Sequence, residues 1–245
     1  MDTEKLPMSK RLLMNAALVP ECSVFADIGC DHAYTCLYLV AAGTAGQALA
    51  MDVKSGPLMR AKENIERYGF SGRVRTRLSD GLKELSVGEA DCILISGMGG
   101  LLTIDILERG WEKVLAAKCI VLQPQSEIAQ VRKFLHKMGY HITAEDMCEE
   151  DGKFYTAMRA QKGKSAVCLS GISGLLSGEA AFCYGACLIE KKHPVLREYL
   201  QRELAKKQEI VAQLKENESE RTNKRLLELL LECGRIGEVL SFLSA

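Results

Sequence analysis

Two carboxylates flank a glycine in D-I-G-C-D-H-A, which covers residues 27–33. An apolar run precedes this segment and a helical pattern follows it, as in a turn that cradles a nucleotide-type cofactor. The turn has one glycine, Gly29, whereas the dinucleotide fingerprint has three. Asp27 and Asp31 would repel a pyrophosphate, but they would attract the sulfonium and ammonium groups of S-adenosylmethionine. The residues therefore favour S-adenosylmethionine over a nicotinamide dinucleotide.

Acidic residues also follow the next two predicted strands. Asp52 lies 23 residues after Gly29 and could accept both ribose hydroxyls, or it could cap the next helix, where Ser55 is better placed. Asp80 could accept the N6 hydrogens of adenine while Gly81 permits close approach, or it could belong to an ordinary Asp-Gly turn. The candidate cofactor-binding residues are Asp27, Gly29, Cys30, Asp52, Val53, Asp80, Gly81, Ser96, Gly97 and Met98.

Two further segments could contact a flat base. The segment S-G-M-G-G, residues 96–100, has three glycines in four positions, which lets backbone groups approach closely. The Asn/Asp-Pro-Pro-Tyr/Phe motif of amino-group methyltransferases is absent there. Q-P-Q, residues 123–125, offers two amides to a base edge, or polar groups to a strand end and a helix cap. His32 could move a proton or order the turn, and Tyr34 could stack on a base or pack.

The elements that position these residues alternate between residues 22 and 160. Runs such as C-I-L-I-S lack the alternation of a half-exposed strand, which indicates burial on both faces of a parallel sheet. We expect strands at residues 24–28, 47–52, 73–78, 91–96, 118–123, 141–148 and 154–160. We expect helices at residues 33–42, 55–68, after Gly100 to about 108, and 126–138. The result is a Rossmann-like α/β sheet that ends in an antiparallel hairpin with its turn at 150–153.

The pattern changes after residue 160. Residues 161–178 are rich in Gly, Ser and Lys, and the chain is helical from about residue 180. The spacing predicts a helical, coiled-coil-like hairpin whose second arm has helices at 221–233 and 236–243. We therefore expect two domains, 1–160 for cofactor binding and 161–245 as the helical hairpin. Residues 191–225 contain ten Lys or Arg and six Asp or Glu, which forms either a solvated face or a surface for RNA phosphates.

Composition excludes several classes. The 245 residues have a net charge of zero, so the whole chain shows no signature of a nucleic-acid binder. The ten cysteines lack metal-site spacing, which favours buried, reduced thiols and no metal. The N-terminus has no secretory pattern, and no apolar run reaches membrane-spanning length. We expect a cytoplasmic protein without membrane contact, and a monomer.

Four motifs together resemble one family. D-I-G-C-D-H-A-Y, S-G-M-G-G, L-Q-P-Q and E-D-G-K-F-Y occur in the order found in TrmK, a family of bacterial tRNA methyltransferases that modify N1 of the adenine at tRNA position 22. S-K-R-L at residues 9–12 and E-K-K-H-P-V-L-R-E-Y-L at the start of the helical hairpin also fit, so the resemblance spans nearly the whole chain. It implies a Rossmann-like class I methyltransferase domain, a coiled-coil-like domain that helps hold tRNA, and S-adenosyl-L-methionine as the only cofactor.

The resemblance also implies a mechanism. Adenine N1 lies on the Watson–Crick edge, so the enzyme must use an unpaired or extruded base. The ring nitrogen already has a lone pair, so catalysis needs positioning more than a strong base. The expected catalytic residues are Asp31, His32, Ser96, Gly97 and Gln123. The expected tRNA-binding residues are Arg11, Tyr34, Gly99, Gly100, Pro124, Gln125, Tyr155, Lys191, Lys192 and Arg197. The alternatives are a methyltransferase for a small molecule or protein, or a non-catalytic cofactor-binding scaffold.

Overall fold

The computed structural model describes residues 6–163, 178–216 and 220–244. The chain divides into two compact units, Met1–Ser165 and Ala166–Ala245. The strands of the first unit are β1 (Cys22–Ile28), β2 (Ala45–Asp52), β3 (Val74–Leu78), β4 (Cys92–Met98), β5 (Cys119–Pro124), β6 (Tyr140–Glu150) and β7 (Lys153–Lys162). Its helices in the described residues are α1 (Lys10–Ala17), α2 (Tyr34–Ala41), α3 (Ser55–Arg67), α4 (Gly100–Arg109), α5 (Trp111–Ala116) and α6 (Ile128–Lys137).

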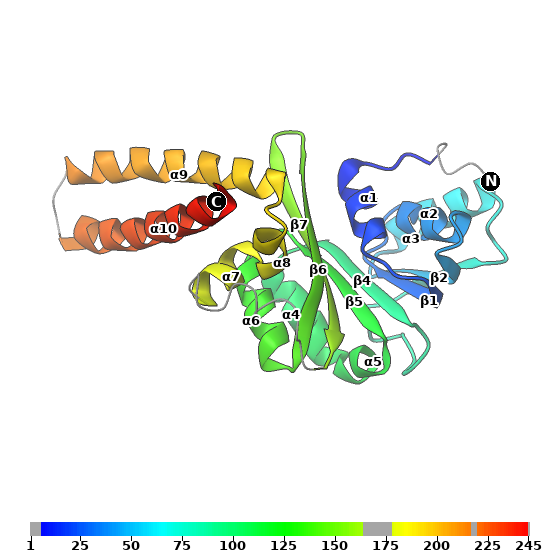
Figure 1. The fold of residues 1–245 in the computed structure, drawn as a ribbon. Coiled ribbons are helices and arrows are strands. Elements are labelled where there is room, and N and C mark those ends of the chain that lie inside the picture. The colour runs from blue at the N-terminus through cyan, green and yellow to red at the C-terminus, as the bar shows by residue number, and fades with distance from the viewer. Residues whose placement is uncertain (1–5, 164–177, 217–219, 245) are drawn as a thin grey trace. The chain divides into compact units, whose positions relative to one another are not determined.

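One seven-stranded sheet organises the first unit, in the order β3-β2-β1-β4-β5-β7-β6 (Figure 1). Strands β1 to β5 pair in parallel, whereas β7 pairs antiparallel with both β5 and β6. Every residue of β5 is buried, as its unbroken apolar run predicts. The predicted Rossmann-like sheet with an antiparallel hairpin at one end is therefore confirmed.

Helices cover both faces of the sheet, and each layer has its own core. Side chains of α1, α2 and α3 pack with Phe25 and Leu94 on one face. Side chains of α4, α5 and α6 pack with Ile93 and Ile95 on the other. Because successive strand residues point to opposite faces, neighbouring positions such as Leu94 and Ile95 serve different cores.

The predicted hairpin turn lies between Glu150 and Lys153. Its two central residues both have positive φ, 52° at Asp151 and 76° at Gly152. Two consecutive positive φ angles are what a two-residue type I′ turn requires, and Asp-Gly is among the sequences that favour it. The turn therefore fixes the register in which β6 and β7 pair, with Glu150 opposite Lys153.

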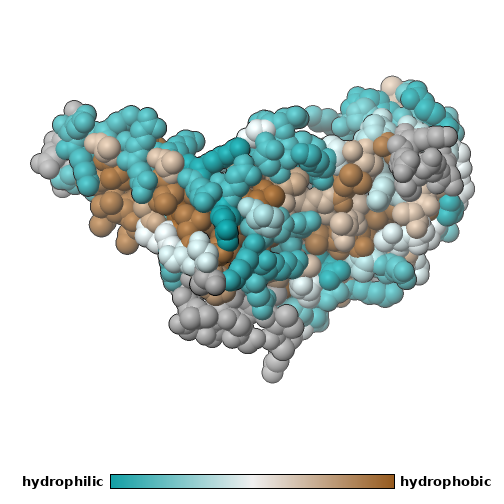
Figure 2. Space-filling model, turned by 45° about the horizontal axis from the view of Figure 1, so that its top comes forward, coloured by the Kyte–Doolittle hydropathy of each residue, from teal (hydrophilic) through white to brown (hydrophobic). Residues whose placement is uncertain are grey.

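The second unit is helical in its described residues. It contains α7 (Gly178–Tyr184), α8 (Ala186–Glu190), α9 (Pro194–Lys215) and α10 (Glu220–Ser244). Helices α9 and α10 pack on each other as the predicted hairpin, which we call the helical arm. On α10, Leu227, Leu230 and Leu231 are exposed, and Figure 2 shows hydrophobic surface along the arm.

Several expectations about helices are wrong. The second arm of the hairpin is one continuous helix, α10, where two helices were expected. Gly234 and Gly237 do not end it, because Leu229, Ile236, Val239 and Leu243 keep one buried face. Helices α1 and α5 were not expected.

Helix α3 also begins differently from the prediction. Ser55 is its first residue, where we expected the N-cap, and Lys54 is the cap residue. The amide of Lys54 donates instead to Asp52 Oδ1 at 2.9 Å. Most of the Gly-, Ser- and Lys-rich segment 161–178, namely residues 164–177, lies outside the described residues. None of the helices in the described ranges is long and apolar enough to cross a membrane.

Candidate functional site

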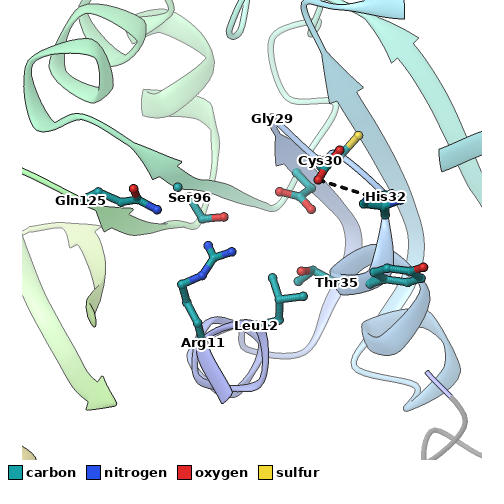
Figure 3. Close-up of a pocket in the computed structure, with 12 residues that line it drawn as sticks. Arg11, Leu12, Gly29, Cys30, His32, Thr35, Ser96 and Gln125 are labelled. Carbon is teal, nitrogen blue, oxygen red and sulfur yellow. Dashed lines mark ion pairs between the residues drawn. The ribbon is translucent and has the colours of Figure 1, made fainter. Parts of the chain in front are cut away.

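A cavity of about 260 Å³ opens where the strand order reverses, at the carboxyl ends of β1 and β4. Ligands of open α/β sheets bind at this topological switch point. The cavity is lined by Arg11, Leu12, Asp27, Gly29, Cys30, Asp31, His32, Tyr34, Thr35, Ser96, Gly97 and Gln125 (Figure 3). The structure thus brings together residues that we predicted from α1, the turn after β1 and the ends of β4 and β5. Leu12 and Thr35 are lining residues that sequence reasoning missed.

Asp27 is the buried acid of this cavity. It is 3% exposed, and its Oδ1 has no hydrogen-bond partner among the described residues. Its Oδ2 receives only a weak contact from the Cys36 thiol at 4.0 Å. Burial and, to a smaller extent, the negative charge of nearby Asp52 raise the pKa of Asp27 to about 7, although Arg11 opposes the rise. A buried carboxylate oxygen without a donor fits a ligand that supplies a cation, such as the ammonium group of S-adenosylmethionine.

The turn after β1 is strained and is held by helix α3. Asp31 and Ala33 both have positive φ, 45° and 58°, although neither is glycine. Such residues cost about 1–3 kcal/mol each unless the surroundings fix them. Asn64 donates to the carbonyl of His32 at 3.1 Å, and Arg60 pairs with the Asp31 carboxylate at 2.9 Å. Sequence reasoning missed both residues of α3.

The His32 ring lies between a carboxylate and an aromatic ring. Its Nε2 is 3.5 Å from Asp31 Oδ2, and the His32 and Tyr34 rings stack with centroids 5.4 Å apart. The side chain of His32 is 39% exposed, so it remains within reach of a ligand in the cavity. Tyr34 therefore packs on His32 and lines the same cavity.

A bulge shapes the end of β4. The pairing with β5 shifts register between Ser96 and Met98, and Gly97 has a φ of 76°. The amide of Gly97 donates to Gln123 Oε1 at 3.2 Å, and Arg11 Nη1 donates to the same oxygen at 3.2 Å. We expected the Gln123 amide to contact a base. The side chain is instead fully buried and acts on Gly97 and Arg11, while Gln125 lines the cavity.

Seven of the ten predicted tRNA-binding residues do not line the cavity, and three of these seven lie close to its lining residues in the sequence. The three are Gly99, Gly100 and Pro124, and Gly100 is buried. A Cβ added to Gly100 would lie 2.4 Å from the carbonyl oxygen of Ser126. The Gly100 amide also donates to Ser126 Oγ at 3.3 Å. Gly100 therefore lets the start of α4 pack against the chain that leads into α6.

A second, more open cavity of about 510 Å³ lies at the ends of β2 and β3. Val53 and Asp80 line it, and Gly81 follows with a φ of 58°. Arg109 holds the Asp80 carboxylate at 2.8 Å and keeps the pKa of Asp80 below its usual range. Sequence reasoning missed Arg109, which lies 29 residues away on α4.

The remaining predicted residues lie at other places. Met98 packs on Gly29, where an added Cβ would lie 2.5 Å from the Met98 methyl group. The Tyr155 ring lies 5.6 Å from the Arg11 guanidinium. Three basic residues belong to the second unit. They are Lys191, Lys192 and Arg197.

Contacts inside the second unit engage the side chains of Lys192 and Arg197. The ammonium group of Lys192 lies 6.0 Å from the Phe242 ring. Arg197 donates to the carbonyl of Leu243. Both side chains thus tie the start of α9 to the end of α10.

Comparisons with known proteins agree on one family. The family model "TrmK: tRNA (adenine(22)-N(1))-methyltransferase" matches residues 25–233. The tRNA (adenine(22)-N(1))-methyltransferase of Bacillus subtilis (strain 168) is 36% identical over 228 residues, 93% of this chain and 94% of that protein. The crystal structure of B. subtilis TrmK is similar with a TM-score of 0.85 at 34% identity, covering 96% of this chain and 100% of that one. Streptococcus pneumoniae Sp1610 in complex with S-adenosyl-L-methionine has a TM-score of 0.81 at 30% identity, covering 95% and 99%.

Proposed function

The chain belongs to the TrmK family of tRNA (adenine(22)-N(1))-methyltransferases, and we propose that it methylates N1 of the adenine at position 22 of tRNA with S-adenosylmethionine as the methyl donor. One observation carries the proposal. A single cavity at the switch point of the sheet joins the unpartnered carboxylate oxygen of Asp27 to the glycine bulge at the end of β4. The carboxylate oxygen of Asp27 suits a cationic cofactor, and the glycine bulge suits a flat base.

The cofactor site that we propose spans both cavities. Asp27 would hold the ammonium group, and Gly29 and Cys30 the backbone side of the amino-acid end. Asp52 lines neither cavity but ends β2, the strand between β1 and β3, where it would hold the ribose hydroxyls. Asp80, fixed by Arg109, would accept the N6 hydrogens of the cofactor adenine. When bound, S-adenosylmethionine supplies an electrophilic methyl group.

The substrate adenine needs an acceptor for its own N6 hydrogens, and we propose the Ser96 carbonyl. In a trans peptide the C=O and the following N–H point in opposite directions. Because the Gly97 N–H donates to buried Gln123, the Ser96 carbonyl points away from Gln123 in a peptide that lines the cavity. Pro124 of β5 lacks an N–H, so it cannot donate a hydrogen bond to the Ser96 carbonyl.

Such an acceptor orients N1 and stabilises the positive charge that develops on methylation. Gln123 then acts by positioning Gly97 and Ser96, not by touching the base. His32, held by Asp31 and Tyr34, is the candidate for a further hydrogen bond to the base.

The helical arm supports a macromolecular substrate. It has exposed lysines at Lys206 and Lys215 of α9 and at Lys224 near the start of α10. Lysines on a long arm neutralise phosphates without reading sequence. We propose that they contact tRNA, that the enzyme works as a monomer, and that it acts on tRNA in the cytoplasm.

The test is methyl transfer with mapping of the product. The protein is incubated with labelled S-adenosylmethionine and unmodified bacterial tRNA, and the nucleosides are separated. We expect label in 1-methyladenosine at position 22, and none when adenine 22 is replaced by guanine. Asp27→Ala and Asp52→Ala should each abolish cofactor binding in calorimetry. Label in another nucleoside, in protein or in a metabolite would contradict the proposal, and binding without transfer would favour a scaffold.

A further inference from the structure

Helix α1 is held at its N-terminus by the β6–β7 hairpin. The backbone amide of Lys10 donates to Glu150 Oε1 at 2.6 Å, across 140 residues of sequence. The Lys10 ammonium group reaches the carbonyl of Glu149 at 3.5 Å. Within the helix, Ser9 Oγ accepts from the amide of Leu12. The amides of a first helical turn have no partner inside the helix, so the Glu150 carboxylate serves as a cap supplied by a distant strand.

The same hairpin contacts the side chain that follows Lys10. The Arg11 guanidinium lies over the ring of Tyr155, and its Nη1 donates to Gln123 Oε1. Glu150 is the last residue of β6, and Tyr155 is the third residue of β7. Both belong to E-D-G-K-F-Y, a motif to which the proposed chemistry gives no other role. The β6–β7 hairpin therefore fixes both the position of the helix that carries Arg11 and the orientation of the Arg11 guanidinium.

Arg11 shares the cavity with Asp27. Figure 3 shows its side chain rising from α1 toward Ser96 and Gln125. Its charge also acts on Asp27, because Arg11 opposes the rise in the pKa of that carboxyl. A cation and a buried carboxylate in one small cavity are complementary to an α-amino acid, which has an ammonium and a carboxylate on one carbon. A neutral adenine ring has no anionic group to match a guanidinium, whereas Arg pairs strongly with carboxylates.

We propose that Glu150 is a positioning residue that, by capping α1, holds Arg11 where its guanidinium binds the carboxylate of the cofactor's amino-acid end. This inference rests on the proposed function, because it assumes that the cofactor's amino-acid end enters the cavity with Asp27. It moves Arg11 from the tRNA side, where the sequence had placed it, to the cofactor side.

The experiment compares two ligands that differ only at that end. S-adenosylhomocysteine has the amino acid, and 5′-methylthioadenosine lacks it. Calorimetry on the full chain measures both dissociation constants for wild type, Arg11→Ala, Glu150→Ala, the double variant and Glu150→Gln. Lys153→Ala is the matched control, because Lys153 is exposed in the same hairpin.

We expect Arg11→Ala and Glu150→Ala each to weaken S-adenosylhomocysteine binding by about 10- to 100-fold, the value of a charge-assisted hydrogen bond. Binding of 5′-methylthioadenosine should change less than about twofold, by the same argument. The double variant should bind S-adenosylhomocysteine no more weakly than Arg11→Ala, because Glu150 acts through Arg11. Glu150→Gln keeps an acceptor for the Lys10 amide and should recover most of the affinity, and Lys153→Ala should match wild type.

Several outcomes would overturn the inference. Additive losses in the double variant would mean that Glu150 does not act through Arg11. Equal losses for both ligands would mean a general disturbance of the domain. Unchanged S-adenosylhomocysteine affinity in Arg11→Ala, with a raised KM for tRNA, would return Arg11 to the tRNA side. Wild type that binds neither ligand would instead contradict the cofactor site of the proposed function, and the inference with it.

Discussion

At the scale of single residues, the unusual group is Asp27. Its carboxyl group is buried, one of its oxygens has no donor in the described structure, and its pKa is raised to about 7. In the unfolded chain the same group would titrate near its ordinary value of 3.8. Between these two values the folded protein holds a proton that the unfolded chain has lost, so folding is linked to pH.

The first prediction follows from that link. A raised folded-state pKa gives stability that is present at low pH and is lost as pH rises through 7, so the ligand-free protein should lose about 2 kcal/mol of unfolding free energy between pH 5.5 and 8 from this group. Asp27→Asn, which cannot ionise, should lack this loss. Urea unfolding of both proteins at the two pH values measures the difference, and parallel pH profiles would contradict it.

The identities of the residues predicted where the site lies better than they predicted which contacts its side chains make. The types and order of Asp27, Gly29 and Gly97 were enough to expect a cavity at the ends of β1 and β4, where the structure has one. The burial of Gln123 was not predictable, because an amide at the last positions of a strand can point to either face of the sheet. The pairing of Arg109 with Asp80 depends on how α4 is rotated on the sheet, which local sequence does not encode.

At the scale of elements, the start of α4 can pack closely on the start of α6 because its first residue is a glycine, which has no side chain. Gly100 packs against the backbone of Ser126, and that carbonyl is 2.4 Å from where a Cβ would be. Backbone atoms cannot turn aside as a flexible side chain can, so the two helix starts would have to separate. The bulge at Gly97, which lines the cavity, lies three residues before this contact.

The second prediction is that Gly100→Ala lowers the free energy of unfolding by about 1–3 kcal/mol. Gly56→Ala, in α3 with no atom within 4 Å of the added Cβ, is the matched control and should be neutral or slightly stabilising. Chemical denaturation measures both. Equal stability of the two variants would show that the contact between the two helix starts relaxes without cost.

Helices and strands with a clear sequence pattern were predicted, and those without one were not. The buried strands and the Asp-Gly hairpin turn were found because apolar runs and a turn with two positive φ angles leave clear marks. Helix α1 was missed because it precedes residue 22, where the alternation of strands and helices that predicted the other elements begins. Helix α10 was divided at Gly234, since a glycine lowers helix propensity but does not end a helix whose apolar face is packed.

At the scale of the whole molecule, the chain combines a fold with a cofactor cavity and a separate helical unit with exposed lysines. Each unit is itself neutral, since residues 166–245 contain eleven Lys or Arg and eleven Asp or Glu, and the excess of positive charge is confined to residues 191–225. The arm already uses part of its charge internally. Arg202 pairs with Glu198 at 2.6 Å, and Lys207 pairs with Glu232 at 2.6 Å.

The third prediction concerns the lysines of the arm. Changing Lys206, Lys215 and Lys224 together to Gln should weaken tRNA binding about tenfold or more and flatten its salt dependence, because fewer counterions are released. Affinity for S-adenosylhomocysteine should not change. Filter binding at several salt concentrations measures the slope. Lys62→Gln combined with Lys137→Gln, exposed positions in α3 and α6, is the control, and equal effects of the two sets would contradict a specific role for the arm.

The bond between Lys10 and Glu150 also bears on how the protein is made. Residue 10 leaves the ribosome long before residue 150, and α1 cannot be capped until the hairpin between β6 and β7 has been synthesised. Contacts between residues so distant in sequence form late and slow folding. The nascent chain can therefore assemble β1 to β5 and pack α1 against α2 before Glu150 is available to cap the helix. Arg11 can donate to Gln123 of β5 at that stage. The Tyr155 ring and the Glu150 cap arrive only with the last strands, so the cavity is completed at the end of the domain's synthesis.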